Sequence, residues 1–394
     1  MLPQPLLRGK RGLSPFIVVT KRLYGTNLVD ILGPRRALVH KNTGEPRTVL
    51  YGASNTQQVH LRPGEVAIKF LLSPINPANL NTVEGTYPSK PILVPGFDEK
   101  NGDVFIGGNE GVAEVVKVAP NEQTDTAMLK EGDWVVMRKA QSGTWTNWRV
   151  MNASEVLRVP RKPVGSKVTE VFAATMMVNG LTALGLVSGI EPGSHLLQNG
   201  ANSGVGQAVI QVAKNLNVKT INFVRDREDF SDVEKHLKEL GATHIFPYSK
   251  LLDRAFKKEF AALRKGSPTK HAFNGIGGAT ATAMGALLDQ DGHLFSYGGM
   301  SKEPLKIPVG LQIFRGLTCH GYWHSRVWSS LSQDTQAEWV NRLTSWKENG
   351  EFQDPKHEII TLKGDDSAVG DQMREVLDRL QKGMVGSKLL LKWE

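Results

Sequence analysis

The stretch Gln198-Asn-Gly-Ala-Asn-Ser-Gly-Val-Gly206 decides the fold of this chain. It follows a short apolar run, His195–Gln198, that suits a buried parallel strand, and it precedes apolar residues at helical spacing over 204–217. A strand, a glycine turn and a helix are the context that a phosphate-binding turn needs, because glycines let the backbone approach a pyrophosphate and the helix N-terminus offers free N–H groups. The glycine spacing departs from G-x-G-x-x-G, so a plain strand-to-helix turn stays open as the alternative.

A second signal follows the next predicted strand, Thr220–Val224, which ends in Arg225-Asp226-Arg227. Dinucleotide folds select their cofactor at this position. An acidic residue there accepts from the ribose 2′-hydroxyl of NADH, so Asp226 keeps that alternative open, whereas arginines bind the 2′-phosphate of NADPH with planar, charged donors. Two arginines around one aspartate favour NADPH, and a solvated charge run at a strand end is the other interpretation.

The composition is that of an ordinary globular chain of about two domains. The 394 residues are 40% hydrophobic and 22% charged, and no apolar run approaches the ~18 residues of a membrane span. The one cysteine, Cys319, excludes an internal disulfide and a multi-cysteine zinc site. A metal site formed by Cys319, His320 and His324 is disfavoured, because one short turn would have to provide tetrahedral geometry.

The net charge of +9 is concentrated at the N-terminus. Residues 1–30 carry five basic side chains against one acidic side chain, Asp30. A basic, acid-poor segment with leucines and hydroxyl residues is typical of a mitochondrial transit peptide, and a disordered basic tail is the alternative. The charge on the rest of the chain is too dispersed to indicate nucleic-acid binding, although it suits an acidic partner.

The sequence changes character twice along its length. Residues 31–165 are rich in strand-like runs separated by Gly, Pro and Asn. In residues 166–320 strands alternate with helices, which predicts a doubly wound parallel sheet, and residues 321–394 form a mixed tail. A nucleotide-binding domain inserted between two parts of a β-rich domain explains this order. The expected strands are 36–40, 66–72, 111–118, 133–137, 195–198, 220–224, 243–246, 271–274, 293–297 and 387–393, and the expected helices are 204–217, 230–240, 279–288, 336–348 and 370–382.

Several candidate site residues lie outside the phosphate turn. Tyr87 lies in Ile75–Pro88, which is rich in Pro, Asn and Gly and is expected to be a loop after a strand. A phenol is protonated at neutral pH and can donate to a carbanion or enolate, although an ordinary surface tyrosine is the alternative. Phe295–Met300 ends a late parallel strand, where open sheets bind ligands. Gly321–His324 is aromatic and suits either a core cluster or a pocket wall.

In combination these motifs resemble those of the mitochondrial trans-2-enoyl thioester reductases, the fungal form especially, in the medium-chain dehydrogenase/reductase superfamily. The resemblance covers nearly the whole chain after the basic N-terminal segment. Zinc-dependent relatives carry a histidine at the position of Asn109. The motifs that carry the resemblance to the enoyl thioester reductases are Ile75-Asn-Pro77, Glu84-Gly-Thr-Tyr-Pro-Ser-Lys-Pro91, Gly108-Asn-Glu-Gly111, Gly132-Asp-Trp134, Gly143-Thr-Trp145, Asn202-Ser-Gly-Val-Gly-Gln207, Arg225-Asp-Arg227, Tyr297-Gly-Gly-Met300 and Ser387-Lys388.

The resemblance implies an α/β fold with a GroES-like β-rich catalytic domain plus a Rossmann doubly wound nucleotide-binding domain. NADPH would deliver hydride to C3 of a trans-2-enoyl thioester, and Tyr87 would protonate C2. It also implies a homodimer in the mitochondrial matrix that acts on acyl-carrier-protein thioesters of fatty acid synthesis, with no bound metal, nucleic acid or membrane insertion. The implied cofactor-binding residues are Asn179, Asn202, Ser203, Gly204, Val205, Arg225, Asp226, Arg227, Tyr297, Gly298, Gly299, Met300, Tyr322, Trp323, His324 and Lys388.

Two other functions share these features. An NADPH:quinone oxidoreductase has the same metal-free fold and phosphate turn, and a nucleotide sensor would bind the cofactor without chemistry. The tyrosine at position 87 favours the enoyl thioester reductase. Within that family an apolar residue usually occupies the position of His324, so this side chain is a difference from the family pattern.

Overall fold

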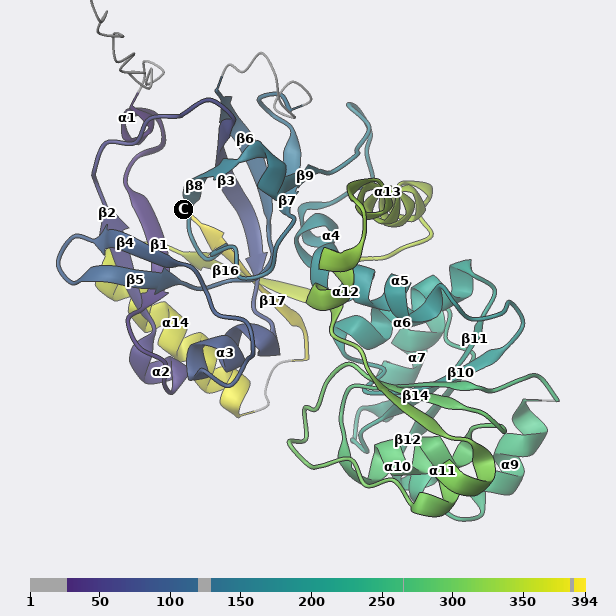
Figure 1. The fold of residues 1–394 in the computed structure, drawn as a ribbon. Coiled ribbons are helices and arrows are strands. Elements are labelled where there is room, and N and C mark those ends of the chain that lie inside the picture. The colour runs from purple at the N-terminus through teal and green to yellow at the C-terminus, as the bar shows by residue number, and fades with distance from the viewer. Residues whose placement is uncertain (1–26, 120–128, 265, 383–385) are drawn as a thin grey trace, which may run out of the picture.

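The computed structural model describes residues 27–119, 129–264, 266–382 and 386–394, which form two lobes (Figure 1). The first lobe contains β1–β9, β16 and β17, and the second contains β10–β15. The strands of the first lobe are β1 (Arg35–His40), β2 (Tyr51–Asn55), β3 (Glu65–Pro74), β4 (Leu93–Asp98), β5 (Gly102–Ile106), β6 (Val112–Val118), β7 (Trp134–Met137), β8 (Trp148–Asn152), β9 (Val156–Arg158), β16 (His357–Leu362) and β17 (Lys388–Trp393).

The first lobe brings the two ends of the described chain together. Its larger sheet has the order β16-β17-β3-β6-β7-β9, with β8 paired to β3, and its smaller sheet has the order β2-β1-β5-β4. The last strand, β17, runs antiparallel to β3, with Leu390 opposite Pro74. The C-terminal tail therefore returns to the lobe in which the chain began. The helices of this lobe are α1 (Leu28–Leu32), α2 (Pro46–Val49), α3 (Pro77–Glu84) and α14 (Asp366–Gln381).

The second lobe is a parallel sheet with the order β12-β11-β10-β13-β14-β15, in which every neighbouring pair is parallel. The alternation of strands and helices confirms the predicted doubly wound fold. Its strands are β10 (His195–Asn199), β11 (Lys219–Val224), β12 (His244–Pro247), β13 (His271–Asn274), β14 (His293–Ser296) and β15 (Thr318–Gly321). Its helices are α6 (Gly204–Asn215), α7 (Phe230–Leu240), α8 (Tyr248–Leu252), α9 (Phe256–Leu263), α10 (Gly278–Leu287) and α11 (Val309–Arg315).

Buried amides tie the carboxyl ends of three central strands. Asn199 Nδ2 donates to Asn274 Oδ1 at 2.9 Å, and Asn199 Oδ1 accepts from the Gly275 N–H at 2.8 Å. Asn274 Nδ2 in turn donates to Ser296 Oγ at 3.0 Å. Buried polar groups stabilise a fold only when they are hydrogen-bonded, and these bonds fix the loops that follow β10, β13 and β14.

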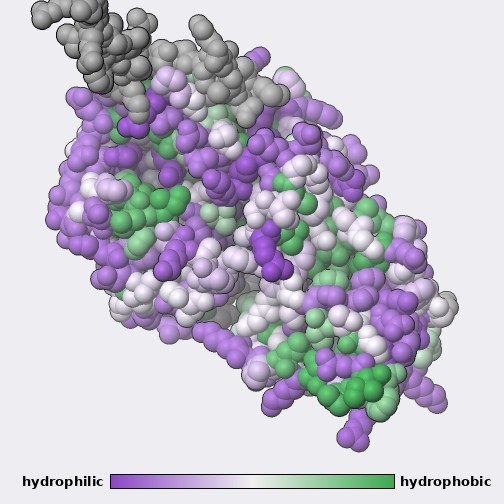
Figure 2. Space-filling model, viewed as in Figure 1, coloured by the Kyte–Doolittle hydropathy of each residue, from purple (hydrophilic) through white to green (hydrophobic). Residues whose placement is uncertain are grey.

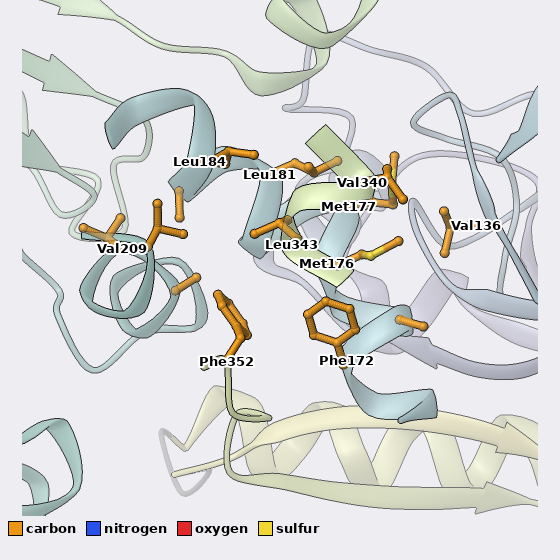
Figure 3. Packing of buried hydrophobic residues seen from close by; sticks show 14 of the residues in the cluster. Val136, Phe172, Met176, Met177, Leu181, Leu184, Val209, Val340, Leu343 and Phe352 are labelled. Atoms are coloured by element: carbon orange, nitrogen blue, oxygen red, sulfur yellow. The ribbon is translucent and has the colours of Figure 1, made fainter. Parts of the chain in front are cut away.

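One apolar cluster is continuous between the lobes. It includes Leu72 and Val112 of the first sheet, and Val209 and Phe273 of the second lobe. Between them lies a helical segment that is built from α4 (Glu170–Thr175), a π-helical turn (Met176–Gly180) and α5 (Leu181–Val187), as Figure 3 shows. The helices α12 (His324–Ser330) and α13 (Gln333–Asn349) complete this region. The shared core holds the loops of both lobes in fixed relation to each other.

The same helical segment is apolar enough to resemble a membrane span. Residues Glu170–Val187 have a mean hydropathy of 1.5, and 83% of this stretch is buried inside the protein. Burial inside a protein core explains a helix that is apolar on all sides. The stretch is therefore accounted for as the core helix between the lobes.

One predicted loop is wrong. The stretch Ile75–Pro88 contains the helix α3, which the Pro and Asn residues begin rather than prevent. Pro77 occupies the first turn, where its missing N–H costs nothing, and Asn79 Oδ1 accepts from the Asn76 N–H at 2.6 Å. Gly85 ends the helix in the left-handed conformation, with φ 79°. These residues are helix caps, which resemble loop residues in sequence.

Candidate active site

The glycine turn after β10 begins α6 as expected. Ser203 is the N-cap, and its hydroxyl accepts from the Gly206 N–H at 3.1 Å. A Cβ on Gly206 would lie 2.5 Å from the Gly200 carbonyl oxygen, so only glycine lets the turn fold back against the helix. The turn therefore presents backbone N–H groups at a helix N-terminus, the arrangement that binds a pyrophosphate.

Asn179 lies against the start of this helix. A Cβ on Gly204 would be 2.5 Å from Asn179 Nδ2, so the glycine makes room for the amide. Asn179 Nδ2 is buried and has no hydrogen-bond partner in the structure. An unsatisfied buried donor beside a phosphate turn is consistent with a cofactor amide or phosphate as its missing partner. The residues present thus fit a dinucleotide.

A network of three side chains bonds to the backbone beside Asn179. Glu110 Oε2 accepts from the Val178 N–H at 2.7 Å, and Val178 lies within the π-helical turn. Asn76 Nδ2 donates to Glu110 Oε1 at 2.7 Å, and Lys388 Nζ donates to Asn76 Oδ1. Burial raises the pKa of Glu110 and lowers the pKa of Lys388, because both charges are removed from water.

The sequence prediction included Lys388 but missed Asn76 and Glu110. The structure places Lys388 partly buried at the start of β17, where its amine donates to Asn76 Oδ1. The available signal for Glu110 was an acidic residue inside the glycine-rich apolar stretch Gly107–Val112. A carboxylate in such a stretch is buried only with partners, and its partners come from β17 and from the N-terminus of α3, which sequence spacing does not reveal.

Tyr87 and Trp323 meet across the two lobes. Trp323 Nε1 donates to the Tyr87 hydroxyl at 3.1 Å, and the rings pack edge-to-face with centroids 6.3 Å apart. The Tyr87 N–H donates to the Asn81 carbonyl at 3.1 Å, which ties the tyrosine to the end of α3. Because the indole N–H donates to the phenol oxygen, the phenol keeps its own O–H to donate elsewhere.

This pair lies at the ligand-binding edge of the parallel sheet. Trp323 follows the carboxyl end of β15, where Gly321 is paired with Ser296 of β14. Tyr297–Met300 continue from the same edge, and the ring of Tyr297 packs on Gly275, whose added Cβ would lie 2.7 Å from the hydroxyl. The carboxyl ends of the strands therefore bring together the phosphate turn, the glycine pair Gly298-Gly299 and the Tyr87–Trp323 contact.

The residues after β11 that the sequence predicts to select the cofactor have separate partners. Arg227 forms a two-point ion pair with Asp229, with Nη2 to Oδ2 at 2.7 Å. The carboxylate of Asp226 accepts from the Ser249 N–H at 3.0 Å and from the Ser249 hydroxyl. Arg225 is exposed at the same strand end. The structure thus separates the three side chains that the sequence prediction treated as one cluster.

Tyr322 and His324, which flank Trp323 in the sequence, lie against Gly185 and Trp328 respectively. The Tyr322 hydroxyl is buried against Gly185, where an added Cβ would lie 2.0 Å from it, and burial raises the pKa of this tyrosine to about 12. Burial also lowers the pKa of His324 from 6.5 to about 4, and its Nδ1 has no partner in the structure. His324 is therefore a neutral, partly buried side chain beside Trp328, with ring centroids 5.9 Å apart.

We expect His324 to make the protein sensitive to acid. Because its folded pKa lies below the unfolded value, the stability that it contributes is present above pH 6.5 and is lost as the pH falls toward 4. For this one group the loss from pH 7.5 to pH 5 is about 2 kcal/mol. The free energy of unfolding in urea should be measured at both pH values. Its fall from pH 7.5 to pH 5 should be smaller in His324→Phe than in the wild type by about this amount. An equal loss of stability in His324→Phe and in the wild type contradicts the assignment.

Among the described residues, no group of three or more His, Cys, Asp and Glu side chains is arranged to hold a metal ion. Cys319 is exposed on β15, and Asn109 is buried beside Glu110. The candidate site is therefore composed of a phosphate turn, an unsatisfied amide, a phenol and an indole.

Comparison with known proteins shows the family to which this chain belongs. The family model for zinc-binding dehydrogenases matches residues 204–341. The mitochondrial enoyl-[acyl-carrier-protein] reductase of Yarrowia lipolytica is 36% identical over 91% of this chain and 92% of its own length, and the Homo sapiens protein of that name is 34% identical over 88% and 87%. The solved 2-enoyl thioester reductase heterodimer from Candida tropicalis has a TM-score of 0.83 and 31% identity, over 91% of this chain and 99% of its own. The chain belongs to the mitochondrial enoyl-[acyl-carrier-protein] reductase family of the medium-chain dehydrogenase/reductase superfamily.

Proposed function

We propose that this protein uses NADPH to reduce trans-2-enoyl thioesters of acyl-carrier protein or CoA to saturated acyl thioesters in mitochondrial fatty acid synthesis. The observation that carries the proposal is the Tyr87 phenol, which is held by Trp323 at the ligand-binding edge of the parallel sheet. The family relationship supports it, and a related solved structure with a TM-score of 0.82 and 31% identity is a complex with NADP and crotonyl-CoA.

The proposed cofactor site extends from the phosphate turn to the aromatic pair. The turn residues 202–205 would bind the pyrophosphate, the arginines at 225 and 227 the 2′-phosphate, and Asn179 together with residues 297–300 the nicotinamide side. Tyr322 and His324, which flank Trp323, would complete this end of the site. When bound, NADPH supplies the hydride that C3 of the enoyl group receives.

Tyr87 is the proposed proton donor. Addition of hydride at C3 leaves an enolate on the thioester, and the Tyr87 O–H would donate its proton to C2. The Trp323 N–H fixes the phenol oxygen and would stabilise the phenolate that remains, because the indole is a donor only. A proton from solvent then restores the phenol. Each turnover consumes one hydride and one proton, which balances the reduction of one double bond.

NADPH oxidation with two acceptors tests this function against its alternatives. Residues 27–394 should oxidise NADPH with crotonyl-CoA and should leave a simple quinone unreduced. Reduction of the quinone alone would establish the quinone oxidoreductase, since that branch shares the fold. Binding of NADPH without oxidation in either assay would establish the nucleotide sensor.

We propose that the N-terminal segment directs the protein to the mitochondrial matrix. The predicted transit peptide, residues 1–30, lies outside the described residues except for its last four. Those include Leu28 of α1, which is buried against Leu61 and Trp148, so a cleavage site before Asn27 would leave the fold complete. A fluorescent fusion of the full chain should localise to mitochondria, and deletion of residues 1–26 should leave it in the cytosol. An identical distribution of both fusions contradicts the prediction.

We propose that two copies associate through the edge of the second lobe. β15 is the edge strand of the parallel sheet, and on the preceding helix α11 Ile313 and Phe314 are 67% and 77% exposed. Figure 2 shows apolar surface gathered at the end of the second lobe that carries α11. An unpaired edge strand beside an apolar patch is typical of a surface that pairs with a second chain.

Sedimentation of charged variants tests the dimer. Ile313→Asp combined with Phe314→Asp should convert the protein to a monomer, because two charges would have to be buried between the copies. Ile92→Asp is the matched control, since Ile92 is 58% exposed in the first lobe. The interface is placed wrongly if the double variant sediments as the wild type does.

A further inference from the structure

Asp226 caps a helix that cannot cap itself. The N-cap position of α8 is Pro247, which has no side-chain acceptor, and within α8 no side chain accepts from the first turn. Asp226 provides the acceptor from the neighbouring strand end, because its Oδ2 accepts from the Ser249 N–H at 3.0 Å. Its Oδ1 accepts from the Ser249 hydroxyl. Both carboxylate oxygens therefore have donors on one residue of α8.

The same helix also contacts the phosphate turn. The hydroxyl of Tyr248, the first residue of α8, accepts from the Gly200 N–H at 2.9 Å. Gly200 lies directly after β10, and Asp226 lies two residues after β11, so α8 bonds to the two strand ends where a dinucleotide binds. A change at the start of α8 would therefore act on Asp226 through these bonds.

The orientation of Asp226 decides which cofactor it favours. A free carboxylate at this position accepts from the 2′-hydroxyl of NADH and repels the 2′-phosphate of NADPH. A carboxylate whose oxygens are both bonded to Ser249 is held toward α8 and has fewer free lone pairs for the hydroxyl, and its charge is partly compensated by these two donors. Arg225, one residue earlier, then remains as the exposed charge at the strand end.

We propose that Ser249 is a specificity-determining residue that holds the Asp226 carboxylate on α8 and so makes a strand end with an acidic residue selective for NADPH. Ser249 acts through Asp226 and is a positioning residue. The inference rests on the proposed use of NADPH. It deepens that proposal because Asp226 is the one residue in the sequence that favours NADH, and Ser249 would counteract it.

Direct cofactor binding tests this role. Dissociation constants for NADPH and NADH are measured without a thioester in the wild type and in Ser249→Ala, Ser249→Thr, Asp226→Asn and the Ser249→Ala/Asp226→Asn double variant. Ser249→Ala should lower the preference for NADPH about three- to tenfold, by weakening NADPH and strengthening NADH, because one of two bonds to a charged group is lost. Ser249→Thr keeps the hydroxyl and should retain the wild-type preference.

The double variant separates a specificity role from a structural one. With Asp226→Asn the charge is gone, so the additional Ser249→Ala change should alter the preference by less than about twofold. The proposal is overturned if Ser249→Ala weakens both cofactors equally, or if it lowers the preference as much in the Asp226→Asn background. Crotonyl-CoA turnover by the wild type is measured in parallel; its absence together with a shifted binding preference would reject the enzymatic function and leave the role of Ser249 intact.

Discussion

Replacement of Tyr87 by phenylalanine should reduce turnover of crotonyl-CoA by about 10²–10⁴-fold, the usual range for loss of a general acid. The substitution keeps the ring that packs edge-to-face on Trp323 and removes the hydroxyl. NADPH affinity should stay near the wild-type value, because the phenol acts on the thioester. Stopped-flow measurement of NADPH oxidation under single-turnover conditions gives the rate of the reduction step itself.

Trp323→Phe provides the comparison for this variant. It removes the N–H that donates to the Tyr87 oxygen and leaves the phenol in the protein. Its loss in rate should therefore be smaller than the loss in Tyr87→Phe. A Tyr87→Phe enzyme with a near-normal single-turnover rate would show that the proton comes from water or from a neighbour such as Thr182, which is buried on α5.

Replacement of both Arg225 and Arg227 by alanine should weaken NADPH binding much more than NADH binding. Each charge-assisted contact to a phosphate is worth about 1.5–3 kcal/mol, so the double variant should lose most of its preference. Arg227 is already paired with Asp229, whereas no ion pair of Arg225 is seen in the described residues. Arg225→Ala alone should therefore cause more of the loss of NADPH affinity than Arg227→Ala alone. Isothermal titration with each cofactor measures both losses.

Lys214 offers a matched control for the arginine variants. It lies in the last turn of α6, on the far end of the helix from the phosphate turn, so Lys214→Ala removes one positive charge without approaching the strand end. Lys214→Ala should change the affinities for NADPH and NADH equally and only slightly, because salt screens a charge at this distance. Equal losses of NADPH and NADH affinity in the arginine double variant would show that these residues do not contact the 2′-phosphate.

Local sequence signals predicted the second lobe well. The period of apolar residues and the Gly200–Gly206 turn placed β10, α6 and β11, and Gly241 marked the end of α7, where it adopts φ 109°. These elements are determined by neighbouring residues, so the sequence contains the information in one window. The change from strand-rich to alternating to mixed sequence predicted the order of the lobes, and the resemblance to a known family added the proposed role of Tyr87.

The parts that were missed depend on contacts between distant segments. The cap that Asp226 provides to α8 joins residues 23 positions apart, and the bond from Lys388 to Asn76 joins residues 312 positions apart. Such pairs leave no periodic pattern. The interpretation of Ile75–Pro88 as a loop failed for a different reason, because Pro at the first turn and Gly beyond the last are also the residues that begin and end a helix.

The position of solvent deuterium in the product tests the central claim most directly. Crotonyl-CoA is reduced with unlabelled NADPH in deuterated water, and the acyl product is analysed by NMR and mass spectrometry. If NADPH delivers hydride to C3 and Tyr87, whose hydroxyl exchanges with solvent, protonates C2, the acyl product contains one deuterium at C2 and none at C3. Deuterium at C3, or a saturated product without deuterium at C2, would contradict the account.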